Sequence, residues 1–253
     1  MVYRLVISPD QLNHPQIHLT PEQHHYLKRV LRLQDGDRFV VMDGCGQTWL
    51  AQLNQEQADI VNVLTESSEL PLAVTLLIAL PKGSGFEEIL RPCTELGVST
   101  IVPVISDRTL LKPSPQKWER WQRIVKEAAE QCERQLVPTV LEPLPFAEAL
   151  IQFKEWGHTG YICVTRRASF PLMSYLSRPL PHNLVIATGP EGGWTDAEVE
   201  SAIAAGLTPV SLGKRILRAI TAPTVALSLV AAASETAETL PDSSFSAPLP
   251  LPC

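Results

Sequence analysis

The sequence has no cysteine pattern that would hold a metal or a disulfide framework, and no long hydrophobic run. Its five cysteines are scattered, and none stands in a C-x-x-C pair, so neither a zinc site nor a disulfide-rich fold is predicted. No apolar run approaches the roughly 20 residues that cross a bilayer. The N-terminus lacks the basic and then apolar stretch of a signal peptide. We therefore expect a cytoplasmic protein with free thiols and no metal.

Two common nucleotide-binding fingerprints are missing as well. Gly83 and Gly85 follow an apolar run, but the third glycine of G-x-G-x-x-G is absent, which disfavours a Rossmann-type oxidoreductase. Gly213 and Lys214 are not preceded by the P-loop glycine at the required spacing. Arg215 also stands where a P-loop has serine or threonine, so a P-loop phosphate-binding site is not predicted.

The length and the hydrophobic content of the chain suffice for one large domain or two smaller ones. The chain has 253 residues, of which 45% are hydrophobic, and this is ample for a packed core. The formal net charge is −6, an unfavourable balance for a nucleic-acid binder. A sum over the whole chain says little about one face, however, and the basic residues are clustered. Nucleic-acid binding therefore remains possible at particular surfaces.

The first 70 residues are predicted to form a small β-rich domain. Thr20, Pro21 and Gln23 form a capping box with proline in the first turn, which predicts a helix start. That helix is expected to carry Leu27, Val30 and Leu31 on one side. Strands are predicted at residues 3–7, 38–42, 48–53 and 58–64, with a hairpin turn at 43–44. The pattern predicts a small barrel over residues 1–70.

Beyond a polar stretch at residues 65–71, strands alternate with helices. This order is typical of an α/β domain with a parallel sheet, and we expect it over residues 72–238. The predicted strands are 74–80, 101–105, 161–165, 184–187 and one near Val210. The predicted helices are 86–96, 115–134, 146–153, 196–205 and 224–236. The tail, residues 239–253, is rich in proline and serine, and its composition predicts disorder.

A glycine-rich turn follows the apolar run at residues 184–187. The chain reads T-G-P-E-G-G-W-T over residues 188–195, and Thr195 with Glu198 makes a capping box for the next helix. This turn lies at the carboxyl end of a predicted strand, where α/β proteins bind ligands. Glycine allows a ligand to approach the main chain closely because no Cβ stands in the way. A ligand-binding loop is therefore predicted here.

A second run, L-G-K-R-I-L-R, follows at residues 212–218. In this order and spacing the two runs resemble the cofactor-binding signature of the SPOUT methyltransferases, and most of all the RsmE branch, the 16S rRNA (uracil-N3)-methyltransferases. Three further stretches resemble that family: T-E-L-G-V at 94–98, S-D-R-T at 106–109 and E-A-A-E-Q-C-E-R at 127–134.

The resemblance implies a fold, a cofactor and a partner. It implies an N-terminal PUA-like small β-barrel, a C-terminal SPOUT α/β domain with a trefoil knot, and a homodimer, for which residues 225–233 offer a small-residue helix surface. S-adenosyl-L-methionine would be held by the two loops. The cofactor-binding residues so implied are Thr188, Gly189, Pro190, Glu191, Gly192, Gly193, Leu212, Gly213, Ile216 and Leu217.

The reaction so implied needs a cation that stabilises negative charge on the uracil and a group that accepts its N3 proton. A cation near O2 or O4 would stabilise a uracil anion, and Arg134 and Arg218 are the candidates. Glu191 is the candidate acceptor of the N3 proton, or it only braces the turn. Arg134 could equally end its helix in solvent. The RNA-binding candidates, for 16S rRNA or the small ribosomal subunit, are Lys28, Arg29, Arg32, Arg38 and Arg108.

The sequence departs from the family pattern at two positions. The family reads L-R-x-E-T-A after the second loop, whereas here Ile220 replaces the acid, and Pro92 stands where lysine is common. The loss of a charged acceptor keeps a non-catalytic RNA-binding protein open as an alternative. Methylation of another base or another RNA is a second alternative.

Overall fold

The computed structural model describes residues 3–110 and 113–239 and contains two separate β-sheets. The first sheet belongs to the N-terminal part and the second to the remainder of the chain, with no strand between residues 64 and 73. Among the described residues, no helix is both long enough and apolar enough to cross a bilayer.

The N-terminal sheet is a curved half-barrel of six strands in the order β1-β4-β5-β6-β3-β2. Thr20 Oγ1 accepts a hydrogen bond from the amide of Gln23, as the capping box predicts. The helix that begins there widens into a π-turn. Leu27 is buried, whereas Val30 is 59% exposed, so the residues predicted on one side of the helix are not all buried. The elements are β1 (Arg4–Val6), β2 (Leu12–Asn13), β3 (Gln16–His18), α1 (Pro21–His25), η2 (Tyr26–Val30), β4 (Arg38–Met42), β5 (Thr48–Asn54) and β6 (Gln57–Leu64).

The second sheet is parallel throughout, as its alternating pattern predicts. Its main path runs β10-β8-β7-β13-β11-β14-β12, and β9 pairs with β8. The strands are β7 (Ala73–Ala79), β8 (Thr100–Ile105), β9 (Thr139–Val140), β10 (Leu144–Pro145), β11 (Thr159–Cys163), β12 (Phe170–Pro171), β13 (Asn183–Thr188) and β14 (Thr208–Ser211).

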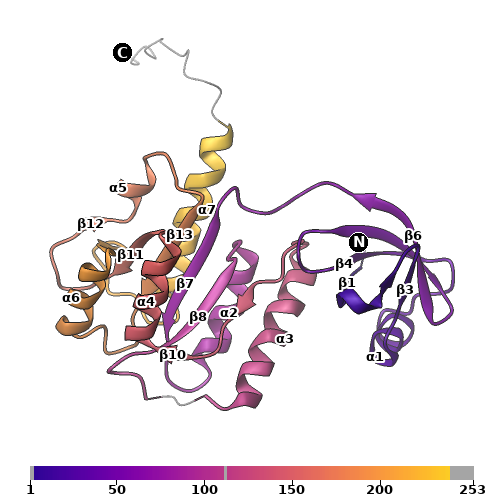
Figure 1. Cartoon of the computed structure of the whole chain (residues 1–253), viewed down its shortest axis with the longest axis horizontal. Helices are drawn as coiled ribbons and strands as arrows, with labels where there is room; N and C mark the ends of the chain where they lie inside the picture. Colours follow the sequence, from indigo (N-terminus) through magenta and orange to yellow (C-terminus); the bar gives the residue numbers. More distant parts are fainter. Residues whose placement is uncertain (1–2, 111–112, 240–253) are drawn as a thin grey trace, which may run out of the picture.

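Helices cover both faces of this sheet, and each face has its own core. The helices are α2 (Gly85–Glu95), α3 (Pro115–Gln131), α4 (Phe146–Trp156), α5 (Met173–Leu176), α6 (Asp196–Ala205) and α7 (Ala222–Thr239). Phe86, Trp121 and Leu227 place α2, α3 and α7 in one core. Phe153 and Val199 place α4 and α6 in the other. In Figure 1 the N-terminal sheet lies on the α3 side, and α6 lies at the opposite end of the molecule.

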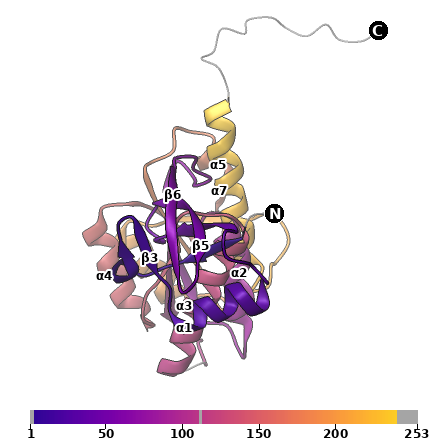
Figure 2. The ribbon, with the colours of Figure 1, turned by 90° about the vertical axis from the view of Figure 1, so that its right-hand side faces the viewer.

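The two parts of the chain meet at the end of α3 and the segment that follows it. Glu130 on α3 accepts a hydrogen bond from the amide of Val6 at 2.8 Å, and Ala129 packs with Val6 and Met42. Cys45 forms an isolated bridge with Leu136. Figure 2 shows β5 and β6 of the N-terminal sheet in front of the C-terminal helices. The small domain is therefore anchored to α3.

The predicted long elements are present, whereas several very short elements were not predicted. Helix α6 spans residues 196–205, as predicted. Strands β2, β3, β9, β10 and β12 and helix α5 have two to four residues each, which is too short for a periodic pattern. Most of the predicted tail, from residue 240 on, lies outside the described residues.

Candidate functional site

Three loops meet where neighbouring parallel strands end. Strand β11 pairs with β13 on one side and with β14 on the other. All three strands run in the same direction, so the segments that follow Cys163, Thr188 and Ser211 emerge at one edge of the sheet. Two of these segments are the loops singled out by the sequence, at residues 188–193 and 212–217. The third, residues 164–167, was not predicted as part of the site.

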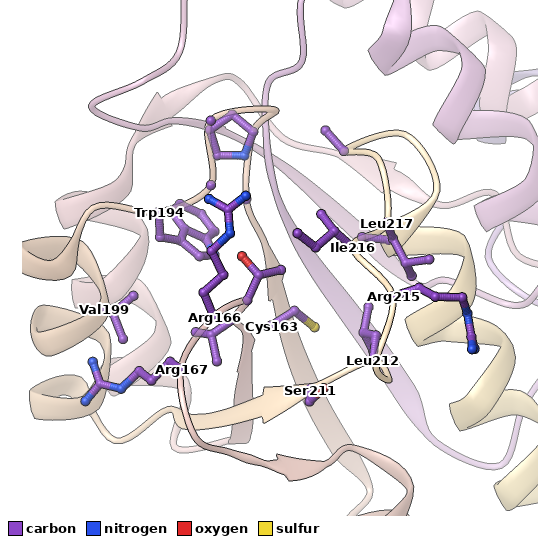
Figure 3. Close-up of a pocket in the computed structure, with 18 of the residues that line it drawn as sticks. Cys163, Arg166, Arg167, Trp194, Val199, Ser211, Leu212, Arg215, Ile216 and Leu217 are labelled. Carbon is purple, nitrogen blue, oxygen red and sulfur yellow. The ribbon is translucent and has the colours of Figure 1, made fainter.

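A cavity of about 530 Å³ opens between these loops. This volume is in the range of small-molecule sites, roughly 300–1,000 Å³. Figure 3 shows the lining side chains, which come from all three loops and from α6. Of the ten predicted cofactor residues, eight line the cavity: Gly189, Pro190, Gly192, Gly193, Leu212, Gly213, Ile216 and Leu217. Thr188 and Glu191 are not among the lining residues.

The tip of the glycine-rich loop is unobstructed, whereas its first residues pack against an aromatic side chain. Gly193 has a φ of +70°, and a Cβ at this position would have no heavy atom within 4 Å. Gly189 lies against the indole of Trp194, at 3.2 Å from its notional Cβ to Nε1. The indole in turn stacks on Phe146, with ring centroids 4.4 Å apart. The loop therefore offers free space at its tip, while Trp194 fixes its base.

Two hydrogen bonds hold the glycine-rich loop from the side of the sheet. Glu191 Oε1 accepts from the amide of Lys82 at 2.9 Å, in the segment after β7. Arg108 Nη1, in the segment after β8, donates to the carbonyl of Gly192. Each bond joins the loop to the end of a neighbouring strand. The family-like S-D-R-T stretch thus supports the loop through Arg108.

The same stretch also fixes the start of α6. Glu198 is buried, and its carboxylate accepts from the amide of Thr195 at 2.8 Å and from the amide of Asp107 at 2.9 Å. Thr195 Oγ1 accepts from the amide of Glu198 at 3.2 Å, which completes the predicted capping box. The helix that lines the cavity therefore begins at a fixed place relative to β8.

The second loop supplies apolar surface and a tight turn. Ile216 is 63% exposed beside the cavity, which is unusual for a large aliphatic side chain. Gly213 has a φ of +118°, which favours glycine. Ile220 follows this loop and packs on the main core, with its Cγ2 3.0 Å from the position of a Gly85 Cβ. The residue that departs from the family pattern therefore fills space at the start of α2.

Two buried polar atoms near the site have no partner within the described protein. Thr188 is 1% exposed, and its Oγ1 is unpartnered. Trp194 Nε1 is likewise buried and unpartnered, in a residue that lines the cavity. Such groups are normally hydrogen-bonded. The lining itself combines open glycine backbone with apolar and charged side chains, which fits a ligand that has both polar and apolar parts.

The end of β11 brings a thiol to the cavity, and the unpredicted third loop brings two arginines. Cys163, Arg166 and Arg167 line it. Burial raises the pKa of the Cys163 thiol to about 12, so this group is a neutral thiol and not a nucleophile at neutral pH. The signal that could have found the loop is the T-R-R run at residues 165–167, one residue after the β11 sequence. That signal becomes meaningful only when β11 is known to lie between β13 and β14.

The structure does not bring Arg134 to the cavity, and its predicted contact with RNA or uracil is corrected. Arg134 is 3% exposed, and its Nη2 lies 2.6 Å from Glu69 Oε2. Its Nη1 donates to the carbonyls of Thr94 and Val98 at 2.9 and 2.8 Å. The guanidinium thus joins the linker to the T-E-L-G-V segment. The guanidinium donors of Arg134 are therefore used in contacts within the protein.

The other two catalytic candidates also lie outside the set of lining residues. Arg218 is exposed at the far end of the second loop. Glu191 is exposed, and its contact with the Lys82 amide matches the alternative that it braces the turn. Arg108, predicted as an RNA contact, is the candidate that does line the cavity. Among the charged residues that the sequence predicted as catalytic or RNA-binding, Arg108 is therefore the one that reaches the cavity.

The remaining basic candidates gather on the N-terminal domain. Lys28 and Arg29 lie on η2 and line a hollow of about 390 Å³ together with His24 and His25. Lys28 also forms an ion pair with Asp35. The other two candidates, Arg32 and Arg38, are exposed. This cluster belongs to the half-barrel and not to the parallel sheet that holds the cavity.

Two family models match the chain in succession. An RNA methyltransferase PUA domain matches residues 19–65, and an RNA methyltransferase domain matches residues 68–231. The second match contains all three loops of the cavity. The division between the two matches falls in the segment that joins the two sheets.

Curated proteins and solved structures give the same result. The chain is 56% identical to ribosomal RNA small subunit methyltransferase E of Synechocystis, over 93% of this chain and 79% of that protein. It is 32% identical to the Bacillus subtilis protein of the same name, over 92% and 96%. A Neisseria gonorrhoeae methyltransferase E bound to S-adenosyl methionine superimposes with a TM-score of 0.82, at 33% identity over 94% and 98%.

Proposed function

Because this chain belongs to the ribosomal RNA small subunit methyltransferase E family, we propose that it methylates N3 of a uridine in 16S rRNA. The methyl donor is S-adenosyl-L-methionine, which is bound in the solved Neisseria gonorrhoeae relative. The observation that carries the proposal is that both family-like loops line a single cavity at one edge of the sheet. Neither loop alone would enclose a ligand.

The residues of the cavity fit the cofactor. The open backbone at Gly193 and Gly213 allows close approach of an adenosyl group, and Leu212, Ile216 and Leu217 provide apolar contact. When bound, the cofactor supplies an activated methyl group on a sulfonium, so the protein has to position the acceptor more than to activate the donor.

The methyl acceptor, uracil N3, has to be activated by the protein, whereas the methyl donor is already reactive. Uracil N3 carries a proton at neutral pH, and it becomes nucleophilic only as that proton leaves. A nearby cation lowers the free energy of the anion that forms. Arg108 is placed for this task because one of its nitrogens is held by the Gly192 carbonyl and the side chain lines the cavity. We assign it in place of Arg134 and Arg218.

Product analysis tests the proposed reaction. The protein is incubated with small ribosomal subunits that lack the modification and with methyl-labelled cofactor, and the RNA is digested to nucleosides. The expected product is 3-methyluridine, detected by mass spectrometry against authentic standards of the other methylated nucleosides. Label in a different nucleoside would replace the N3 assignment, and a protein that binds the cofactor without transferring label would support the non-catalytic alternative.

The homodimer remains part of the proposal. One side of α7 is buried in the core through Ala226, Leu227 and Val230. Val225 and Leu229 are partly exposed, although Leu229 also packs against the core. Val225 therefore leaves small apolar surface for a second copy. A sedimentation mass of twice 27.9 kDa is expected, and Val225→Glu should convert the dimer to a monomer. A sedimentation mass of 27.9 kDa for the protein without substitutions would contradict the proposed homodimer.

Four further assignments stay predictions. The trefoil knot is supported by the family, and α7 packs against α2, α5 and β13. The domain limits 1–70 and 72–238 are supported by the change of sheet between β6 and β7. The exposed N-terminal basic cluster is proposed to bind rRNA. A cytoplasmic location is proposed because the substrate is ribosomal RNA.

A further inference from the structure

The opening of the cofactor cavity concentrates positive charge in an acidic protein. Arg166 and Arg167 come from the loop after β11, and Lys214 and Arg215 from the loop after β14. We call these four residues the cationic rim. Figure 3 shows Arg167 and Arg215 on opposite sides of the cavity. The lining set contains a single carboxylate, Asp196, although the chain has a formal net charge of −6.

Most of this charge is not compensated within the protein. Arg167 pairs with Glu200 at 2.8 Å, but the two side chains are 38% and 63% exposed, and such solvent-exposed pairs contribute little. Within residues 3–110 and 113–239, no carboxylate lies within ion-pair distance of Arg166, Lys214 or Arg215. The rim is therefore available to an anion from outside the chain.

The cofactor does not account for the rim. Its reactive centre is a sulfonium, whose positive charge is repelled by nearby cations, and it carries only one carboxylate. Four cations on two sides of an opening match a ligand with several negative charges spaced along its length. An RNA strand is such a ligand, and arginine binds its phosphates through paired N–H donors.

The backbone at Arg166 supports a functional role for the rim. Arg166 has a φ of +58°, a left-handed conformation that side-chain-bearing residues rarely adopt. Backbone strain of this kind is concentrated at binding and catalytic sites. In Figure 3 Arg166 lies toward the middle of the cavity, on the side of Trp194. The loop thus holds its arginine over the opening despite the conformational cost.

We propose that the cationic rim clamps the phosphates on either side of the target nucleotide, with Arg166 and Arg167 on one flank and Lys214 and Arg215 on the other. This inference rests on the proposed function, and it assigns positioning to residues that the family-like motifs did not single out for RNA. The clamp holds the strand by its backbone, so the base between the two flanks is free to enter the cavity toward the cofactor.

The clamp also couples the two substrates electrostatically. Without RNA, the rim disfavours the sulfonium of S-adenosylmethionine relative to S-adenosylhomocysteine, which lacks that charge. Bound phosphates neutralise the rim and remove the penalty. RNA should therefore raise the affinity for the charged donor more than the affinity for the uncharged product. This difference can be measured by calorimetry with and without a short uridine-rich oligoribonucleotide.

Methylation kinetics on unmodified small ribosomal subunits test the clamp. Arg167→Gln and Arg215→Gln each remove one charge from one flank. We expect the KM for subunits to rise with kcat largely kept, and the slope of log KM against log [KCl] at fixed Mg²⁺ to fall by about one unit per side chain. Arg215→Lys keeps the charge and should keep the slope. The Kd for the cofactor alone should not weaken in any of these variants.

The matched control is Lys154→Gln, which removes one exposed charge from α4, away from the lining residues. It should leave the KM and the salt slope unchanged. An unchanged slope in both arginine variants, with normal turnover, would overturn the clamp and leave the methyltransferase assignment intact. Failure of the unmodified protein to bind the cofactor would instead overturn the proposed function.

Discussion

The guanidinium of Arg134 and the carboxylate of Glu69 form a buried ion pair at 2.6 Å, with 3% and 13% of the two side chains exposed. Glu69 Oε1 also accepts from the amides of Gln135 and Leu136 at 2.9 Å each. Both carboxylate oxygens of Glu69 therefore accept hydrogen bonds. The pair fastens the linker between the two sheets to the segment that follows α3.

This pair predicts that Arg134→Ala affects stability and not chemistry. Removing one partner leaves a buried charge unpaired, which costs about 3–5 kcal/mol. We expect a large loss in the free energy of unfolding, measured by urea denaturation. Glu69→Ala should behave alike, while the folded fraction of either variant should bind the cofactor with unchanged affinity. A stable Arg134→Ala protein without activity would restore the catalytic assignment.

Glu191 is expected to act through the Lys82 amide. Glu191→Gln keeps an oxygen that can accept this hydrogen bond, whereas Glu191→Ala removes it. If Glu191 braces the turn, the glutamine variant should retain most of kcat and the alanine variant should lose cofactor affinity. If Glu191 accepts the N3 proton, both variants should lose kcat alike. Single-turnover rates together with the Kd of the cofactor distinguish the two roles.

The tip of the glycine-rich loop can be tested with a matched pair of glycines. Gly193 and Gly157 have φ values of +70° and +64°, and neither has a heavy atom within 4 Å of a notional Cβ. Substitution by valine strains both backbones, at a cost of roughly 1–3 kcal/mol. Only Gly193 lines the cavity, so only Gly193→Val should abolish cofactor binding by calorimetry. Equal loss in Gly157→Val would show that the effect is global.

The interface between the two domains should respond to pH through Glu130. Burial raises the pKa of this carboxyl group above its usual value, and the hydrogen bond from Val6 only partly opposes this. A raised pKa in the folded state means that its stability contribution is complete below the unfolded pKa and is lost as the pH rises through the folded one. Glu130→Gln keeps an acceptor for Val6 and carries no charge.

We therefore expect Glu130→Gln to unfold at a higher temperature than the unmodified protein at neutral pH, with the difference vanishing in acid. Thermal unfolding across this pH range measures it. A variant that is less stable at neutral pH would mean that the ionised carboxylate stabilises the interface, through Val6 or through nearby Lys126.

Local sequence patterns predicted the elements that depend on local interactions. The capping boxes at Thr20 and Thr195 place two helix starts, and the helix end before Gly97 follows from the φ of +93° that this glycine adopts. The glycine-rich turn after β13 could be read in the same way. Each of these signals acts between residues three or four positions apart, so no knowledge of the rest of the chain is needed.

The order of strands in the sheet decided which loops form the site, and the sequence alone does not specify that order. Residues 164–167 belong to the cavity only because β11 lies between β13 and β14. Likewise, Arg134 is an arginine at a helix end in the sequence, and the carboxylate that neutralises it lies 65 positions away. The chain by itself determined its local backbone, its two-domain pattern and its family-like loops. Which charges are paired and which stay free for an RNA strand was decided by the tertiary structure, because pairing depends on contacts between distant segments.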